Sequence, residues 1–142
     1  MSRDGGTWVA PNPGNDSDPM QPDAFGMQWR AVNEGYGLVG RLYGIENGQE
    51  TDEFWTYREF WHPGERRAIL EQWGGAGVYG VGATGGEEPY EQLEQRFWLA
   101  DGRSWRDGHR VVEDGDTYVT HQFNIDDAGV WTPNGSYTWT RQ

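Results

Sequence analysis

The chain has 142 residues, including 22 glycines and nine tryptophans, and its formal net charge is −12. It contains no cysteine, which excludes disulfides, thiolate metal sites and cysteine nucleophiles. Its eleven basic residues are all arginines, which excludes Schiff-base and P-loop lysines, and the negative net charge argues against a nucleic-acid partner.

Residues 1–24 carry four of the seven prolines together with Gly, Asn, Asp and Ser, and they show no hydrophobic periodicity. We expect a flexible or surface-draped N-terminal arm here, followed by one folded domain over residues 25–142. The arm lacks the pattern of a signal peptide, and no apolar run in the chain reaches membrane-spanning length. We therefore expect a cytoplasmic protein without membrane contact, and the lysine-free composition suggests a GC-rich bacterial source.

Two strands are predicted next, over residues 25–33 and 36–45, because apolar and aromatic residues alternate in both. Asn47-Gly48 follows and is a strong signal for a tight hairpin turn. The segment 52–73 then predicts a second hairpin, in which two aromatic-rich runs flank a turn around Pro63-Gly64.

The two faces of the 52–73 hairpin follow from strand alternation. One face is predicted to carry Trp55, Tyr57, Glu59 and Trp61 together with Arg66, Ala68, Leu70 and Gln72. Both faces mix aromatic and charged side chains, which is not the pattern of a sheet that covers a dry core. A sheet around a partly polar cavity would show this pattern. A barrel packed against a second copy of the chain would show it too, so a homodimer is kept as an alternative.

The glycine-rich run after the hairpin contains the spacing G-x-G-x-x-G at Gly75, Gly77 and Gly80. In a dinucleotide-binding motif a helix begins at the third glycine and holds the pyrophosphate, but the residues that follow here are too rich in glycine for a helix. We interpret residues 76–84 as a strand whose glycines permit a sharp bend or the close approach of another backbone.

Four further strands are predicted over residues 90–99, 104–113, 117–125 and 130–141, with a break in the last at Pro133-Asn134-Gly135. In the first of them Leu93, Gln95 and Phe97 share the more apolar side, and a helix over residues 91–98 is the main alternative. Short strands joined by turns predict an all-β fold, a single antiparallel β-barrel of about 8–10 strands.

The tail of the chain combines an Asp-Gly turn, a strand with the pattern D-x-Y-x-T-x-x-F, an acidic-Gly-x-Trp turn and a closing strand with Tyr137, Trp139 and Arg141. In this succession of turns and strands, residues 25–142 resemble a group of uncharacterised bacterial lipocalin-like barrels in the calycin superfamily. The resemblance implies a lipocalin-like barrel with a cavity for a small molecule. It implies no particular chemistry, because calycin barrels include carriers, haem binders and a few cyclases.

Two histidines form the first candidate site. On the strand 104–113, Asp107 and His109 share the face of the apolar residues, and on the strand 117–125 His121 does so. If both apolar faces point inward, a three-residue loop over residues 114–116 places His109 opposite His121. Such a pair would suit a metal site, acid/base chemistry or haem binding, and two satisfied or exposed histidines are the alternative.

Carboxylates form the second candidate site. Glu59 and Glu71 each lie among apolar or aromatic neighbours, where burial would raise the pKa toward the range that a general acid or base needs. An ion pair with an inward-facing arginine is the alternative that we favour. The chain shows no Ser-His-Asp order, no HExxH helix and no calcium loop, so covalent hydrolytic chemistry has no support.

The expected function is the binding of a small, largely apolar or aromatic organic ligand inside the barrel, without a cofactor or metal. The expected ligand-binding residues are Trp29, Trp55, Tyr57, Trp61, Trp105, Phe123 and Trp139. The first alternative is a cofactor-free cyclase or isomerase of secondary metabolism with Glu59, His109 and His121 as catalytic candidates. The second alternative is haem or metal binding through His109 and His121.

Overall fold

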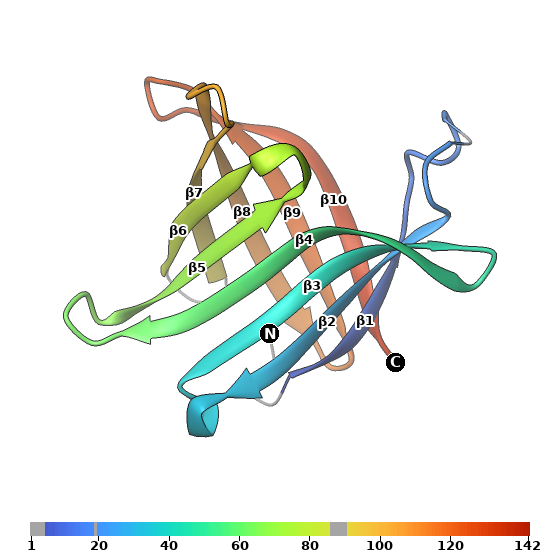
Figure 1. Cartoon of the computed structure of the whole chain (residues 1–142), viewed down its shortest axis with the longest axis horizontal. Coiled ribbons are helices and arrows are strands. Elements are labelled where there is room, and N and C mark those ends of the chain that lie inside the picture. Colours follow the sequence, from blue (N-terminus) through green and yellow to red (C-terminus); the bar gives the residue numbers. More distant parts are fainter. Residues whose placement is uncertain (1–4, 19, 86–90) are drawn as a thin grey trace.

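The computed structural model describes residues 5–18, 20–85 and 91–142 and shows a closed barrel of ten antiparallel strands (Figure 1). Each strand pairs with its neighbours in sequence, and β1 pairs with β10 to close the barrel. The predicted all-β barrel is therefore confirmed. The strands are β1 (Gly5–Pro11), β2 (Ala24–Val32), β3 (Gly37–Glu46), β4 (Gln49–His62), β5 (Arg67–Gly74), β6 (Tyr79–Gly85), β7 (Glu91–Trp98), β8 (Ser104–Asp114), β9 (Thr117–Ile125) and β10 (Trp131–Arg141).

Strand β1 closes the barrel, whereas the sequence predicted a flexible arm over residues 1–24. Trp8 pairs with Met27 of β2 on one side and with Arg141 of β10 on the other. Trp8 is 4% exposed. The connection to β2 is held by Asn12, whose side chain donates to the carbonyl of Pro22 at 2.9 Å. The apolar part of β1 is too short to show a period, so its strand depends on the two neighbours that pair with it.

The long β4–β5 hairpin has the faces that the sequence predicted. Glu59 pairs with Leu70 and Tyr57 with Gln72, so these side chains share the inner face. The strands are joined by four residues, 63–66, rather than by two, and Arg66 adopts a φ of 55° there. The two extra loop residues leave the parity of the strands unchanged, which is why the face assignment survived the longer turn.

Aromatic rings lie over glycines of other strands, on the adjacent strand for Phe97 and Gly80 and two strands away for Trp131 and Gly108, which explains why the chain is rich in both. The ring of Phe97 lies so close to Gly80 that a Cβ there would approach it to 2.4 Å, and the ring of Trp131 lies equally close to Gly108, at 2.1 Å. Gly80 is the third glycine of the G-x-G-x-x-G spacing, and it lies within β6 rather than at the start of a helix. The spacing therefore serves packing between strands.

The β8–β9 pairing differs from the prediction by one residue. The loop has two residues, with Gly115 at a φ of 62°, and Asp114 pairs with Thr117. His109 consequently pairs with Gln122, while His121 pairs with Arg110. A slip of one residue exchanges the two faces of a strand. Tyr118, Thr120 and Gln122 thus face inward, and Val119, Phe123 and Ile125 face outward.

The remaining strand predictions agree with the structure in kind. Residues 91–98 form β7 and not the alternative helix, and β10 has an irregular register between Pro133 and Gly135 where a break was predicted. Two single 3-10 turns, Asn33–Gly35 and Gly75–Gly77, complete the secondary structure. In the described part of the chain, no helix has the length and apolar character needed to cross a bilayer.

Candidate ligand-binding cavity

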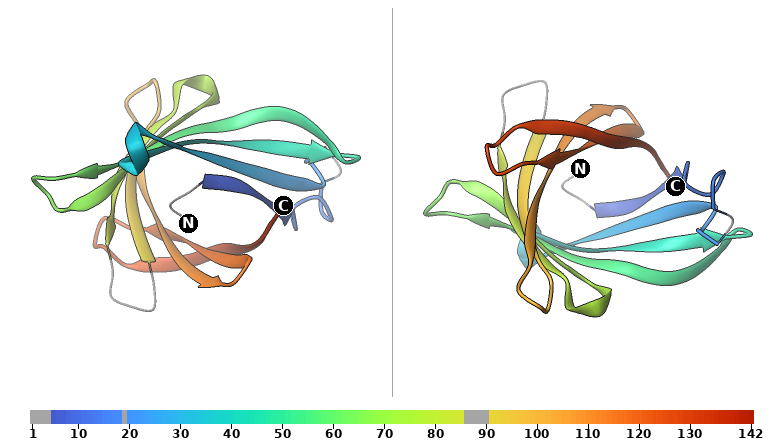
Figure 2. Two further views of the ribbon diagram at one scale, coloured as in Figure 1. Left: turned by 90° about the horizontal axis from the view of Figure 1, so that it is seen from below. Right: turned by 90° about the horizontal axis from the view of Figure 1, so that it is seen from above.

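The barrel encloses a cavity of about 220 Å³ whose wall is formed by inward-facing side chains of β2 to β9. Figure 2 shows the strands arranged around this interior from both ends. A second hollow of about 450 Å³ adjoins the cavity toward the β1–β2 connection and shares His109 and Trp55 with it. The lining residues are Met27, Trp29, Leu42, Trp55, Tyr57, Glu59, Leu70, Gln72, Thr84, Glu91, Leu93, Gln95, Phe97, Trp105, Asp107, His109, Val111, Tyr118, Thr120 and Gln122.

Stacked aromatic pairs give the cavity a rigid apolar wall. Trp29 stacks on Tyr57 with ring centroids 5.2 Å apart, and Phe97 stacks on Trp105 at 5.1 Å. The members of each pair come from different strands, so the stacking also ties the sheet together. A flat aromatic ligand would find matching surfaces on both sides of this interior.

Some of the side chains that line this interior carry buried polar atoms without a hydrogen-bond partner. Gln95 is 1% exposed and donates to Gln72 Oε1 at 3.0 Å, but its own Oε1 has no partner. The indole Nε1 of Trp29 is also buried and unpaired. An unmet donor or acceptor in a buried place costs roughly 1–3 kcal/mol, so such groups call for a further partner. A ligand with one acceptor and one donor would satisfy both atoms.

Glu59 lies on the cavity wall, and no arginine is among the lining residues that the structure describes. Burial raises the pKa of its carboxyl to about 7, and the nearby carboxylate of Glu91 adds to the rise. At neutral pH this group is therefore close to half-protonated and can donate or accept a proton. Glu71, the other candidate, lies on the outer face and forms an ion pair with Arg58. Glu71 therefore forms an ion pair, although on the outer face and not with an inward-facing arginine as predicted, and none of the described arginines forms an ion pair with Glu59.

His109 and Asp107 form the polar part of the wall on β8. Burial lowers the pKa of His109 to about 4, so the imidazole is neutral at pH 7. Burial also raises the pKa of Asp107, although its Oδ2 accepts a hydrogen bond from Trp105 Nε1 at 3.0 Å. A neutral imidazole offers one donor and one acceptor nitrogen to a ligand. Both side chains were predicted to share the inward face, and they do.

Two of the predicted site residues lie on the outer face of β9. His121 is exposed on the outer surface, because the two-residue β8–β9 loop reverses the predicted face of β9. The predicted pairing of His109 with His121 is therefore wrong, and the two histidines cannot ligate one metal or haem from the same face. Phe123 also faces outward and packs on Trp131 at 5.4 Å. The prediction that Phe123 binds the ligand is therefore wrong.

Apart from Trp61, the other predicted ligand-binding residues lie along the interior. Trp29, Trp55, Tyr57 and Trp105 line the main cavity, and Trp139 lines the adjoining hollow. Trp61 lies at the opposite end, in a wide depression that also contains Glu59, and it is 52% exposed. Gln95 and Tyr118 also line the cavity, although neither was predicted as a site residue. Gln95 had a readable signal, since it is the single polar residue between Leu93 and Phe97 on an apolar face.

The described residues contain no group of three or more His, Cys, Asp or Glu side chains that could hold a metal ion. Comparison of the chain with protein-family models, with curated proteins and with solved structures finds no match. The site therefore has to be interpreted from its own geometry.

Proposed function

We propose that the protein binds a small, largely apolar or aromatic organic molecule inside the barrel. The observation that carries the proposal is an aromatic-walled cavity of about 220 Å³ whose lining residues include Trp29 and Gln95, each with a buried polar atom that has no partner. Pockets for drug-sized ligands usually measure about 300–1,000 Å³, so this cavity fits a molecule built on a single ring system. The unpaired Trp29 Nε1 and Gln95 Oε1 would set the orientation of that molecule.

The strand order supports a place among lipocalin-like barrels. All ten strands follow one another around the barrel, an up-and-down arrangement that lipocalins share. Small barrels of this kind enclose a ligand in their interior. This reasoning concerns fold alone and names no ligand.

The test compares two tryptophans of similar exposure on opposite faces of the barrel. Trp105 is 38% exposed and lines the cavity, whereas Trp73 is 44% exposed on the outside of β5. We expect saturation-transfer NMR to detect binding of 2-phenylethanol and indole to the wild type. W105L should weaken this binding at least fivefold and W73L should leave it unchanged. Equal effects of the two changes, or no binding of either probe, would contradict the proposal.

A second candidate function is cofactor-free acid/base catalysis in the same cavity, as in a cyclase or isomerase. It is favoured by Glu59, whose pKa of about 7 suits proton transfer at neutral pH. Phenylacetone in deuterated buffer provides a test, because a general base exchanges the protons next to its carbonyl group. NMR should show exchange that the wild type accelerates and E59Q does not. Equal exchange with both proteins would exclude this candidate.

A further inference from the structure

The hollow that adjoins the cavity is an aromatic mouth at one end of the barrel. Its volume is about 450 Å³, and the β1–β2 connection contributes Gln21 and Pro22 to its lining. Phe25 contacts Phe54 and Tyr137 edge to face, with ring centroids 5.8 Å apart in both pairs. The side chain of Phe54 is nevertheless 37% exposed. An aromatic ring that stays exposed inside a hollow offers apolar surface to a further molecule.

The mouth and the cavity share a set of side chains that line both of them. We call this set the neck, and it includes Met27, Tyr57, His109, Thr120 and Gln122. These side chains come from β2 and β4 on one side and from β8 and β9 on the other, and the two groups of strands are not neighbours in the barrel. The neck therefore surrounds the interior where the two hollows meet, and a molecule of sufficient length would occupy both.

The neck and the mouth offer polar groups but no charge. The described residues that line the mouth include no Asp, Glu or Arg. Tyr57 and His109 are both neutral at pH 7, because burial raises the pKa of Tyr57 and lowers the pKa of His109 to about 4. Neither the phenol nor the imidazole has a hydrogen-bond partner in the described part of the chain. An uncharged polar group on a ligand would provide such a partner.

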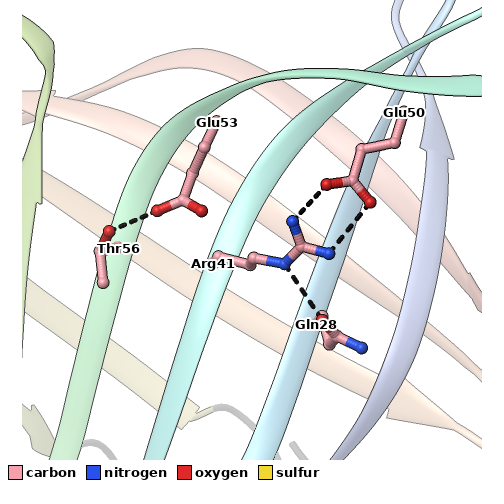
Figure 3. A network of polar contacts seen from close by, with 5 residues as sticks. All are labelled: Gln28, Arg41, Glu50, Glu53 and Thr56. Atoms are coloured by element: carbon pink, nitrogen blue, oxygen red, sulfur yellow. Dashed lines mark hydrogen bonds and ion pairs between the residues drawn. The ribbon is translucent and has the colours of Figure 1, made fainter.

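The charged side chains of the strands around the mouth lie on the outer face instead. Arg41 directly precedes Leu42, which lines the mouth, but its own side chain lies outside. Its guanidinium binds both carboxylate oxygens of Glu50 and donates to Gln28 (Figure 3). The carboxyl group of Glu59 lines the cavity and not the mouth. A ligand in the mouth and the neck thus meets only apolar and neutral polar side chains among the described residues.

We infer that the ligand is an uncharged molecule with two aromatic rings joined through a polar group, with one ring in the cavity, the polar group at the neck and the second ring in the mouth. This inference rests on the proposed function and specifies the ligand class. The cavity alone, at about 220 Å³, is smaller than the usual 300–1,000 Å³ of ligand pockets, whereas the cavity and the mouth together fall within that range. A ring in the mouth would cover Phe54 and pack against it.

Three probes test the inference by calorimetry at pH 7.5. They are 2-phenylethanol with one ring, 1,2-diphenylethanol with two rings and a hydroxyl between them, and 1,2-diphenylethylamine with an ammonium group in place of that hydroxyl. We expect 1,2-diphenylethanol to bind at least tenfold more tightly than 2-phenylethanol, because its second ring occupies the mouth. The amine should bind at least fivefold more weakly than 1,2-diphenylethanol, because its charge would lie at the neck without a counter-ion.

Two phenylalanines of β4 locate the second ring. Phe54 lines the mouth, whereas Phe60 lies in the wide depression at the opposite end of the barrel. F54A should weaken the binding of 1,2-diphenylethanol at least fivefold and should leave the affinity for 2-phenylethanol within twofold of the wild type. F60A should change neither affinity. Weaker binding of 1,2-diphenylethanol by F60A but not by F54A would place the ligand at the opposite end and would overturn the inference.

The outcomes separate the two proposals. If 2-phenylethanol binds as tightly as 1,2-diphenylethanol, the cavity holds a single ring, and only the present inference is overturned. If the amine binds as tightly as 1,2-diphenylethanol, the ligand need not be uncharged, and again only the present inference is overturned. If none of the three probes binds, the proposed function and this inference both fail.

Discussion

Replacing Glu59 by Gln should stabilise the folded protein at neutral and alkaline pH. The carboxyl has a pKa of about 7 in the folded state, against an ordinary value of 4.5. Because the folded state holds the proton more tightly than the unfolded state, the contribution of Glu59 to the free energy of unfolding is highest at low pH. It falls as the pH rises from 4.5 to about 7 and is then constant.

The size of the effect follows from the pKa difference. At 1.36 kcal/mol per pKa unit, the full rise corresponds to roughly 3 kcal/mol, and water that enters the cavity reduces this to about 1–2 kcal/mol. We therefore expect E59Q to exceed the wild type in unfolding free energy by about 1–2 kcal/mol at pH 8, with the gain disappearing by pH 4. Glutamine keeps the shape of the protonated side chain, so little else should change.

Urea unfolding followed by tryptophan fluorescence from pH 4 to 8 measures this difference. E71Q serves as the matched control, because it removes an exposed ion pair with Arg58, which is worth about 0–1 kcal/mol. That control should destabilise the protein slightly and should gain no stability at pH 8. A difference between E59Q and the wild type that is the same at every pH would refute the reasoning.

Three further changes test other parts of the structure by urea unfolding. His109 has a lowered pKa of about 4, so the wild type should lose stability as the pH falls from 6.5 toward 4. H109Q should recover about 1–3 kcal/mol at pH 4, and an unchanged acid profile would contradict this. V9P removes an N–H from β1, which pairs on both sides, and should cost about 3 kcal/mol or more; a dispensable N-terminal arm would tolerate it. G108A places a methyl group 2.1 Å from the ring of Trp131 and should lower the free energy of unfolding by about 1–3 kcal/mol. G75A, with open space at its Cβ, should change it by less than about 0.5 kcal/mol. Equal losses of stability in the two variants would argue against the contact between Gly108 and Trp131.

Alternation alone predicted which side chains share a face in β4, β5, β7 and β8, but in β4 and β5 it did not tell which face points inward. Glu59, Gln95 and His109 share their faces with apolar neighbours, and the barrel turns those faces inward. Strand β9 could not be predicted in this way, because its apolar residues cover the outside. Phe123 packs there on Trp131, whose ring occupies the space that Gly108 leaves open. The outward direction of this apolar face depends on the packing of three strands, β8, β9 and β10, and therefore cannot be predicted from β9 alone.

The ends of the chain illustrate a second limit. The apolar residues around Trp8 are too few to show a strand period, and the strand that closes on them, β10, lies at the opposite end of the sequence. Local composition therefore indicated an arm, while the barrel needed a closing strand. The aromatic neighbours of Glu59 in the sequence suggested that burial would raise its pKa, and the structure agrees. The position of the arginines on the outside could not be predicted, because it depends on the whole sheet.

The central claim is that small molecules bind within the barrel and not on its surface, and the nine tryptophans report on it directly. A titration of nitrogen-labelled protein with indole and with 2-phenylethanol, followed by the indole N–H signals of the protein, distinguishes the two places. The account predicts shifts for Trp29, Trp55 and Trp105, which line the cavity, and none for Trp73, Trp98 and Trp131, which lie on outward faces. Shifts confined to the outer tryptophans, or no shifts at all, would contradict it.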